Sequence, residues 1–203
     1  MKALLACGIA LGILFAVPAM AQVWNEVDDA GDLPGTVQTP TGSGDLTAIA
    51  GTIAASDADM YCVRIDVPAN FSATTCAGST LDTQLWLFFE DGRGVACNDD
   101  DPGGCGLQSK VTGTFVPTAG QYLLAVTVYN RDPQDASAQL IWANSPFGAE
   151  RQPDGPGAAN PIASWTGTTS DTGAYTIALT GVTFCTPNAV EPATWGEIKS
   201  LYR

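Results

Sequence analysis

The sequence predicts an all-β protein built as an antiparallel β-sandwich. Its candidate strands are short, rich in Val, Ile, Thr, Tyr and Phe, and bounded by Gly, Pro, Asn or Asp. The 22 glycines and 13 prolines suit a chain made of strands and turns. Residues 120–129 are largely apolar on both faces, which is typical of a strand covered on both sides in the middle of a sandwich. Before the C-terminus no stretch has a convincing helical periodicity.

We expect four regions along the chain: a signal peptide (1–21), an N-terminal extension (22–44), a sandwich domain (45–187) and a C-terminal tail (188–203). Residues 145–161 interrupt the sandwich as a Pro/Gly-rich surface loop. The expected strands are Leu46–Thr52, Asp59–Val67, Phe71–Cys76, Thr83–Glu90, Gly94–Asn98, Lys110–Val116, Gly120–Tyr129, Ala136–Ala143 and Gly173–Phe184.

The first 21 residues have the pattern of a secretory signal peptide. Lys2 supplies the positive charge, residues 3–17 are an apolar run too short to span a bilayer, and Ala19-Met20-Ala21 is an A-x-A cleavage site. The mature chain, Gln22–Arg203, has no further apolar run near 18 residues. We therefore expect a protein without a membrane span that is secreted to the extracellular space, the cell surface or the periplasm.

The charge balance excludes several function classes. The chain has 21 Asp and Glu, eight Lys and Arg, and no His. An acidic protein lacks the basic face that nucleic acid or an anionic membrane requires. Without histidine there is no Ser–His or Cys–His catalytic pair. The carboxylates fall in turns and not opposite one another across a cleft, so a hydrolase with paired carboxylates is not favoured either. We expect a protein that is not an enzyme.

The most informative segment is Asp82–Ser109, which is a strand, a tight turn, a second strand and an acidic loop. Folding the strands back about the turn between Gly92 and Arg93 brings Asp82 roughly level with Gly103, in the same corner as the loop. Several oxygen ligands without a nitrogen or sulfur donor are what calcium prefers. A solvated acidic turn remains the alternative, because Asn, Asp and Gly also form turns. The expected calcium ligands are Asp82, Asn98, Asp99, Asp100 and Asp101.

Five cysteines follow the signal peptide, and disulfides are the default state in an exported chain. Cys62 and Cys76 are equidistant from the middle of the turn between them, so we expect them to face each other across a hairpin. Cys97 and Cys105 bracket the acidic loop and would close it. The sequence leaves the connectivity open. Cys185 is expected to be the unpaired cysteine, either as a buried thiol or as an attachment point.

Five motifs follow one another along the chain: Ile53-Ala54-Ala55-Ser56-Asp57-Ala58-Asp59-Met60-Tyr61-Cys62-Val63, Leu81-Asp82-Thr83-Gln84-Leu85-Trp86-Leu87-Phe88, Gly94-Val95-Ala96-Cys97-Asn98-Asp99-Asp100, Gly120-Gln121-Tyr122-Leu123-Leu124-Ala125-Val126 and Thr172-Gly173-Ala174-Tyr175-Thr176-Ile177. In this order they resemble the bacterial pre-peptidase C-terminal domain family. The resemblance covers roughly residues 45–183 and implies a compact antiparallel sandwich of jelly-roll type, usually non-catalytic and appended to secreted exoenzymes; some members bind calcium. We expect no peptidase before the domain, so the family name implies no activity.

The resemblance also bears on the site residues. It implies ion ligation by Asp82, Asn98, Asp99 and Asp100, with Asp101 as a local addition. Asp57 and Asp59 match the D-x-D positions of the family, where either ligation or a role at the entry of a strand explains them.

The C-terminal tail is a candidate for a short helix. Thr194 and Glu197 form a capping box, and Trp195, Ile198 and Leu201 fall on one face. The ending resembles short Thr-Trp-Gly-x-Ile-Lys-x-Leu-Tyr-Arg tails of some exported bacterial proteins. It is either a helix that docks on the sandwich or a sorting and attachment signal.

We therefore expect a secreted, non-catalytic module with a structural calcium ion that serves adhesion, assembly or attachment at the cell surface, with a protein or a glycan as partner. A carbohydrate-binding module is the alternative. Trp86 and Trp142 fit core positions, whereas Trp165, next to the 145–161 loop, is the candidate for an exposed platform that stacks on sugar rings.

Overall fold

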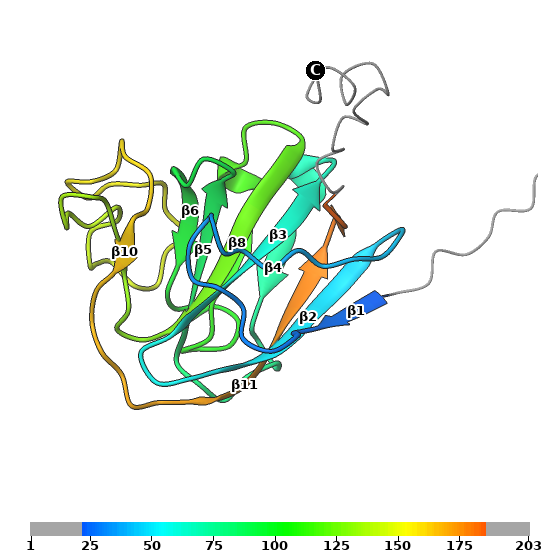
Figure 1. The fold of residues 1–203 in the computed structure, drawn as a ribbon, viewed down its shortest axis with the longest axis horizontal. Coiled ribbons are helices and arrows are strands. Elements are labelled where there is room, and N and C mark those ends of the chain that lie inside the picture. The colour runs from blue at the N-terminus through cyan, green and yellow to red at the C-terminus, as the bar shows by residue number, and fades with distance from the viewer. Residues whose placement is uncertain (1–21, 186–203) are drawn as a thin grey trace, which may run out of the picture.

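The computed structural model describes residues 22–185, whose regular structure consists of β-strands and two short 3-10 turns (Figure 1). Two five-stranded sheets pack face to face, with the strand orders β1-β2-β11-β4-β7 and β12-β3-β8-β5-β6. Every strand pair in these sheets is antiparallel except β1 with β2. The predicted all-β antiparallel sandwich is confirmed.

The bounds of the elements are as follows. The first sheet contains β1 (Gln22–Asn25), β2 (Leu46–Ile53), β11 (Gly173–Thr180), β4 (Ser72–Thr74) and β7 (Lys110–Thr112). The second contains β12 (Val182–Thr183), β3 (Ala58–Ile65), β8 (Gly120–Val128), β5 (Thr83–Phe89) and β6 (Gly94–Asn98). The other elements are a two-stranded sheet, β9 (Pro133–Gln134) with β10 (Ser164–Trp165), and the turns η1 (Pro68–Asn70) and η2 (Gly113–Phe115).

Two hydrophobic cores explain why β8 is apolar on both faces. The main core fills the space between the sheets, where Ile49 and Ile177 of the first sheet meet Leu85 and Val126 of the second. The second core lies on the outer face of the second sheet. There the segment 130–165, with β9 and β10, covers the sheet beside β5 and β6 (Figure 1). The predicted central position of residues 120–129 is confirmed, since β8 lies between β3 and β5.

The second core contains four aromatic side chains. Trp86 and Phe88 project from β5 and contact Trp142 and Trp165 of the covering segment, with ring centroids 5.4–6.3 Å apart. Leu33 also packs against it, so part of the 22–44 segment belongs to the folded unit. The same segment contributes β1, which pairs with β2. What was expected as an extension therefore supplies an edge strand and part of a core.

Three predicted strands differ clearly from the structure. The predicted strand Lys110–Val116 ends at Thr112, where the chain enters the turn η2. The segment Ala136–Ala143 does not form a strand, because the carboxylate of Asp135 accepts the backbone N–H groups of Ser137 and Gln139 and bends the chain into a turn. The predicted strand Gly173–Phe184 is divided at Gly181, whose φ of +67° ends β11 in the first sheet and starts β12 in the second.

The disulfides join Cys62 to Cys185 and Cys76 to Cys105, and Cys97 is a buried free thiol. The expected hairpin between Cys62 and Cys76 is wrong, because β3 and β4 lie in different sheets. Instead β12 pairs with β3, Val182 opposite Ile65 and Thr183 opposite Arg64, and this register brings residue 185 beside residue 62. The expectation that Cys185 is unpaired is therefore also wrong. The predicted tail helix (188–203) and signal peptide (1–21) lie outside the described residues.

Candidate metal centre

The acidic loop is positioned by the β5–β6 hairpin. Leu85 pairs with Asn98, and the register shifts by a bulge between Leu87 and Phe88 near the turn at Gly92, whose φ is +84°. Continued to the start of β5, this register puts Asp82 level with residue 101 and not with residue 103. The hairpin therefore brings Asp82 closer to the end of β6 than simple folding about the turn predicts.

Three of the five predicted ligands come together. One carboxylate oxygen each from Asp82, Asp99 and Asp100 lie within 4.8 Å of one another, and all three residues are half-buried. We call this group the loop cluster. Its backbone is fixed on two further sides, since the Tyr129 amide donates to the Asp82 carbonyl at 2.9 Å and the Ser109 hydroxyl to the Asp99 carbonyl at 2.7 Å.

Among residues 22–185, no basic side chain pairs with the loop cluster. Burial, followed by the charges of Asp100 and Asp82, raises the pKa of Asp99 to about 7. Burial, and then Asp100, also raises the pKa of Asp82. The Oδ1 atoms of Asp82 and Asp99 are buried without a hydrogen-bond partner. None of the ion pairs found in residues 22–185 involves the cluster. A cation placed between these oxygens would satisfy them and offset their mutual repulsion.

The side chain of Asn98, the fourth predicted ligand, makes hydrogen bonds within the loop. Its Nδ2 donates to the Asp100 carbonyl at 2.8 Å, and its Oδ1 accepts the backbone N–H of Lys110 at 2.7 Å. Asn98 is also 4% exposed. It shapes the acidic loop and holds it against β7.

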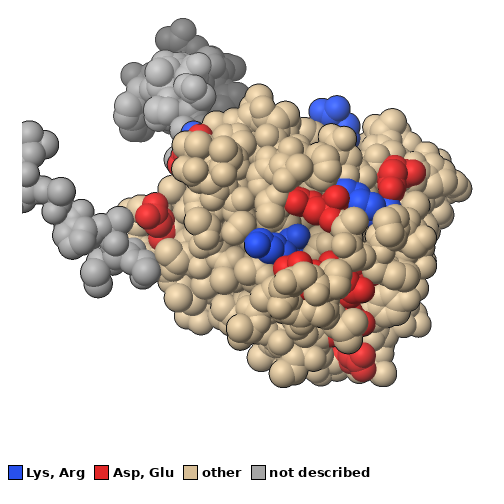
Figure 2. Space-filling model, turned by 180° about the vertical axis from the view of Figure 1, so that it is seen from behind, with Lys and Arg blue, Asp and Glu red and all other residues tan. Residues whose placement is uncertain are grey.

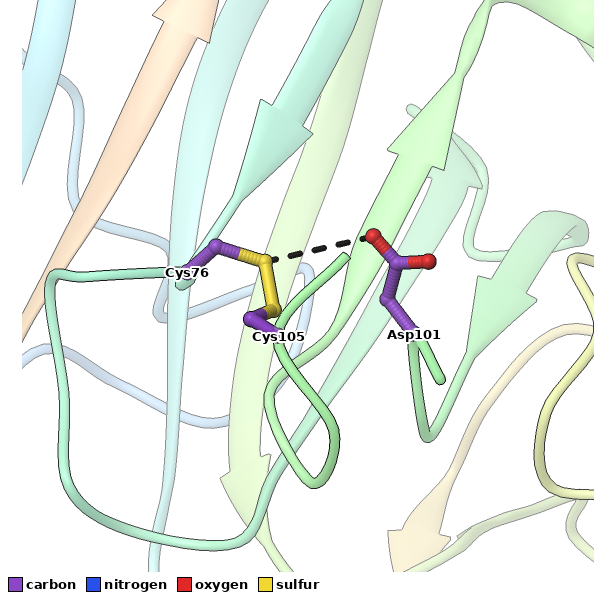
Figure 3. Close-up of side chains that lie close together, drawn as sticks. All are labelled: Cys76, Asp101 and Cys105. Carbon is purple, nitrogen blue, oxygen red and sulfur yellow. Dashed lines mark hydrogen bonds between the residues drawn. A yellow bond between two sulfur atoms is a disulfide. The ribbon is translucent and has the colours of Figure 1, made fainter. Parts of the chain in front are cut away.

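Asp101 does not join the loop cluster. Its carboxylate points toward the Cys76–Cys105 disulfide, with Oδ2 4.0 Å from Cys76 Sγ (Figure 3). A disulfide sulfur has no proton to donate and is not a thiolate, so these three residues are not a metal site while the bond is intact. The backbone of Asp101 instead organises the loop, since its carbonyl accepts the N–H groups of residues 104–106.

The D-x-D positions lie at the entry of β3. Asp57 precedes the strand, and its carboxylate accepts a hydrogen bond from the Ala58 amide at 2.8 Å. This contact is the role at the strand entry. Asp59 lies within β3, fully buried, and one of its oxygens is grouped with a carboxylate oxygen each from Glu26 and Asp29. Glu26 and Asp29 were not among the predicted ligands, because residues 22–44 were expected to be an extension of the sandwich. The acidic run Glu26-Val27-Asp28-Asp29 was the signal that could have identified them.

Trp86, Trp142 and Trp165 do not form an exposed sugar platform. Trp86 and Trp142 are buried in the second core, as predicted. The expectation of an exposed Trp165 is wrong: its side chain is 9% exposed, it meets Trp86 and Phe88 edge-on, and its Nε1 donates to the Asp32 carbonyl at 2.7 Å.

Most of the face shown in Figure 2 is uncharged, and Asp and Glu gather in its centre and toward its lower edge beside isolated Lys and Arg. Within residues 22–185 no helix has the length and apolar character needed to cross a membrane.

No protein-family model matches the chain, and comparison with curated protein sequences finds no significant match. The resemblance to the pre-peptidase C-terminal domain family therefore stays a prediction from the sequence motifs.

Proposed function

We propose that the protein is an exported, non-catalytic β-sandwich module that binds calcium through the loop cluster and serves adhesion, assembly or attachment at the cell surface. The observation that carries the proposal is the convergence of Asp82, Asp99 and Asp100, with two buried oxygens that have no partner. Calcium accepts six to eight oxygen ligands, so three carboxylates leave positions for backbone oxygens, water or a ligand hydroxyl.

Calcium would act structurally in this module. The loop cluster joins the start of β5 to the end of β6, and the disulfide Cys76–Cys105 ties the same loop to the end of β4. An ion that binds only the folded state stabilises it by mass action, by about 2.7 kcal/mol at a concentration 100 times the Kd. The surface around the loop would therefore be rigid where calcium is abundant, as it is outside cells.

The test is thermal unfolding of the purified, oxidised protein in calcium-depleted buffer and in millimolar calcium. Calcium should raise the midpoint by several degrees in the wild type and in Asp101→Asn. The rise should be smaller in Asp99→Asn/Asp100→Asn, which lack two carboxylates of the cluster. Asp101→Asn is the matched control, because it removes one charge from the same loop outside the cluster. An equal rise in the loop variant would contradict binding at this cluster.

Glycan binding is a second candidate because an exposed aromatic pair flanks the loop cluster. The rings of Tyr129 and Phe147 meet edge-to-face at 5.9 Å, and the side chains are 38% and 37% exposed. Their backbones contact the cluster directly, Tyr129 at the Asp82 carbonyl and Phe147 at the Asp100 amide. Glycan-array binding that requires calcium and is lost in Phe147→Ala would support this function. Binding that Phe147→Ala leaves unchanged would remove its structural basis.

A further inference from the structure

A second group of carboxylates lies where the N-terminal segment meets the sandwich. Glu26 directly follows β1, Asp29 lies in the next loop, and Asp59 projects from β3. One oxygen from each lies within 4.8 Å of the others. We call this group the strand cluster. It involves neither the β5–β6 hairpin nor any residue of the loop cluster.

Asp59 is the feature that distinguishes this group from an ordinary acidic surface. The residue is 0% exposed, and its Oδ2 accepts the hydroxyl proton of Tyr175 at 2.7 Å. Tyr175 has one proton, so Tyr61 is the donor in the 2.5 Å contact between the two phenol oxygens. The second oxygen of Asp59, Oδ1, is buried and has no hydrogen-bond partner in the described part of the chain. A buried carboxylate oxygen without a partner is costly, which indicates a missing ligand.

Glu26 is held rigidly beside it. Its Oε1 accepts the Ala30 amide at 3.0 Å and its Oε2 the Thr52 amide at 2.8 Å. Gly51 makes this approach feasible, because a Cβ there would lie 2.5 Å from the Tyr175 hydroxyl and 2.7 Å from Glu26 Oε2. Two backbone amides thus fix the carboxylate in place before any ion arrives, which lowers the ordering cost of binding.

The charges around the strand cluster are unbalanced. Together, burial and the weaker repulsion from Glu26, Asp57 and Asp29 raise the pKa of Asp59 to about 8, although the hydrogen bond from Tyr175 acts in the opposite direction. The charge of Asp57, followed by burial, raises the pKa of Asp29. The cluster takes part in none of the salt bridges formed within residues 22–185.

We propose that Glu26, Asp29 and Asp59 form a second site for an oxygen-preferring divalent cation such as calcium, which fastens β1 and the following loop to β3. The donor set contains only carboxylate oxygens, and neither nitrogen nor sulfur. Asp29 is exposed, so the ion enters from solvent and keeps water on that side. This inference does not depend on ion binding at the loop cluster.

The test combines calcium stoichiometry by titration calorimetry with hydrogen exchange on the purified, oxidised protein. We expect two calcium ions in the wild type and one in Asp29→Asn, in Asp59→Asn and in the loop variant Asp99→Asn/Asp100→Asn. In that loop variant calcium should still slow exchange in peptides 24–32 and 50–61, where the Ala30 and Thr52 amides bind Glu26. In Asp29→Asn protection should remain only at 98–109.

The controls separate this inference from the proposed function. Asp45→Asn removes one exposed charge outside both clusters and should bind two ions. Asp29 is exposed, so its variant remains informative if Asp59→Asn fails to fold. Calcium bound only at 98–109 would overturn the second site and leave the loop cluster intact. Calcium bound only at 24–32 and 50–61 would support the second site and reject the first.

Discussion

Cys97 shows how residues that are distant in the sequence determine the environment of one side chain. It sits in β6, opposite Trp86 of β5, and belongs to the aromatic second core. It is 3% exposed, and burial raises the pKa of its thiol well above the ordinary value. A thiol that is shielded from solvent and does not ionise to the thiolate is unreactive.

We therefore predict that a maleimide or disulfide reagent does not label Cys97 in the native protein. In the unfolded, unreduced chain that starts at Gln22, one thiol should react, since the other four cysteines are in disulfides. Peptide mapping after labelling checks the position. Rapid native labelling of Cys97 would contradict its burial, and labelling at Cys185 would contradict its disulfide with Cys62.

At the residue scale, the sequence is sufficient to predict that carboxylates lie close together when one hairpin positions them. Asp82, Asp99 and Asp100 lie next to two consecutive strands, so local pairing was sufficient to place them. Glu26 and Asp59 are 33 positions apart, and they meet only because the segment after β1 returns over β3. A local sequence pattern therefore does not predict that Glu26 and Asp59 lie close together.

At the scale of elements, each disulfide connects parts of the sandwich that strand pairing alone holds weakly. Cys62–Cys185 fastens the two-residue strand β12 to β3 across 123 positions. Cys76–Cys105 fastens the acidic loop to the end of β4 across 29 positions. In the chain-entropy model these crosslinks contribute about 5 and about 3–4 kcal/mol, respectively.

Removal of the two disulfides should therefore affect stability and calcium binding differently. We predict that Cys62→Ala/Cys185→Ala lowers the unfolding midpoint more, yet leaves the calcium-induced rise from the loop cluster in place. Removing Cys76 and Cys105 should weaken calcium binding at the loop cluster, because the loop must then be ordered at the moment of binding. Calorimetric titration of both double variants measures this, and equal calcium affinity in the two would contradict it.

The same scale shows why most strands were predictable and some were not. Strands with apolar residues between turn formers, such as Gly94–Asn98, begin and end where the pattern predicts. Residues 136–143 were misassigned because Ile141 and Trp142 are buried without being in a strand. Their burial comes from lying on the second sheet, while hydrogen bonds to Asp135 set the local backbone. Burial and strand geometry produce the same apolar signal in a short segment.

At the scale of the whole molecule, a chain with a net charge of −13 brings carboxylates together in two clusters. In each cluster a folded-state carboxyl holds its proton more tightly than an ordinary aspartate, with a pKa of about 8 for Asp59 and about 7 for Asp99. The acids with lowered pKa values, Asp91 and Asp135, act in the opposite direction, but only near and below their ordinary pKa of 3.8. Different pH windows therefore separate the two effects.

We predict that the calcium-depleted protein becomes less stable as the pH rises from about 4.5 to about 8. In this window the folded state binds more protons than the unfolded state, and so the free energy of unfolding falls with pH, by up to about 1.4 kcal/mol per pH unit for each proton. Below pH 4 the loss of charge at Asp91 and Asp135 reverses the trend. Saturating calcium favours the ionised carboxylates and should flatten the decline, so its stabilising effect is larger at pH 8 than at pH 5. Urea unfolding at a series of pH values, with and without calcium, measures both slopes. A depleted protein that gains stability from pH 5 to pH 8 would show that the buried carboxylates are already neutralised by protein groups, and neither cluster would then need an ion.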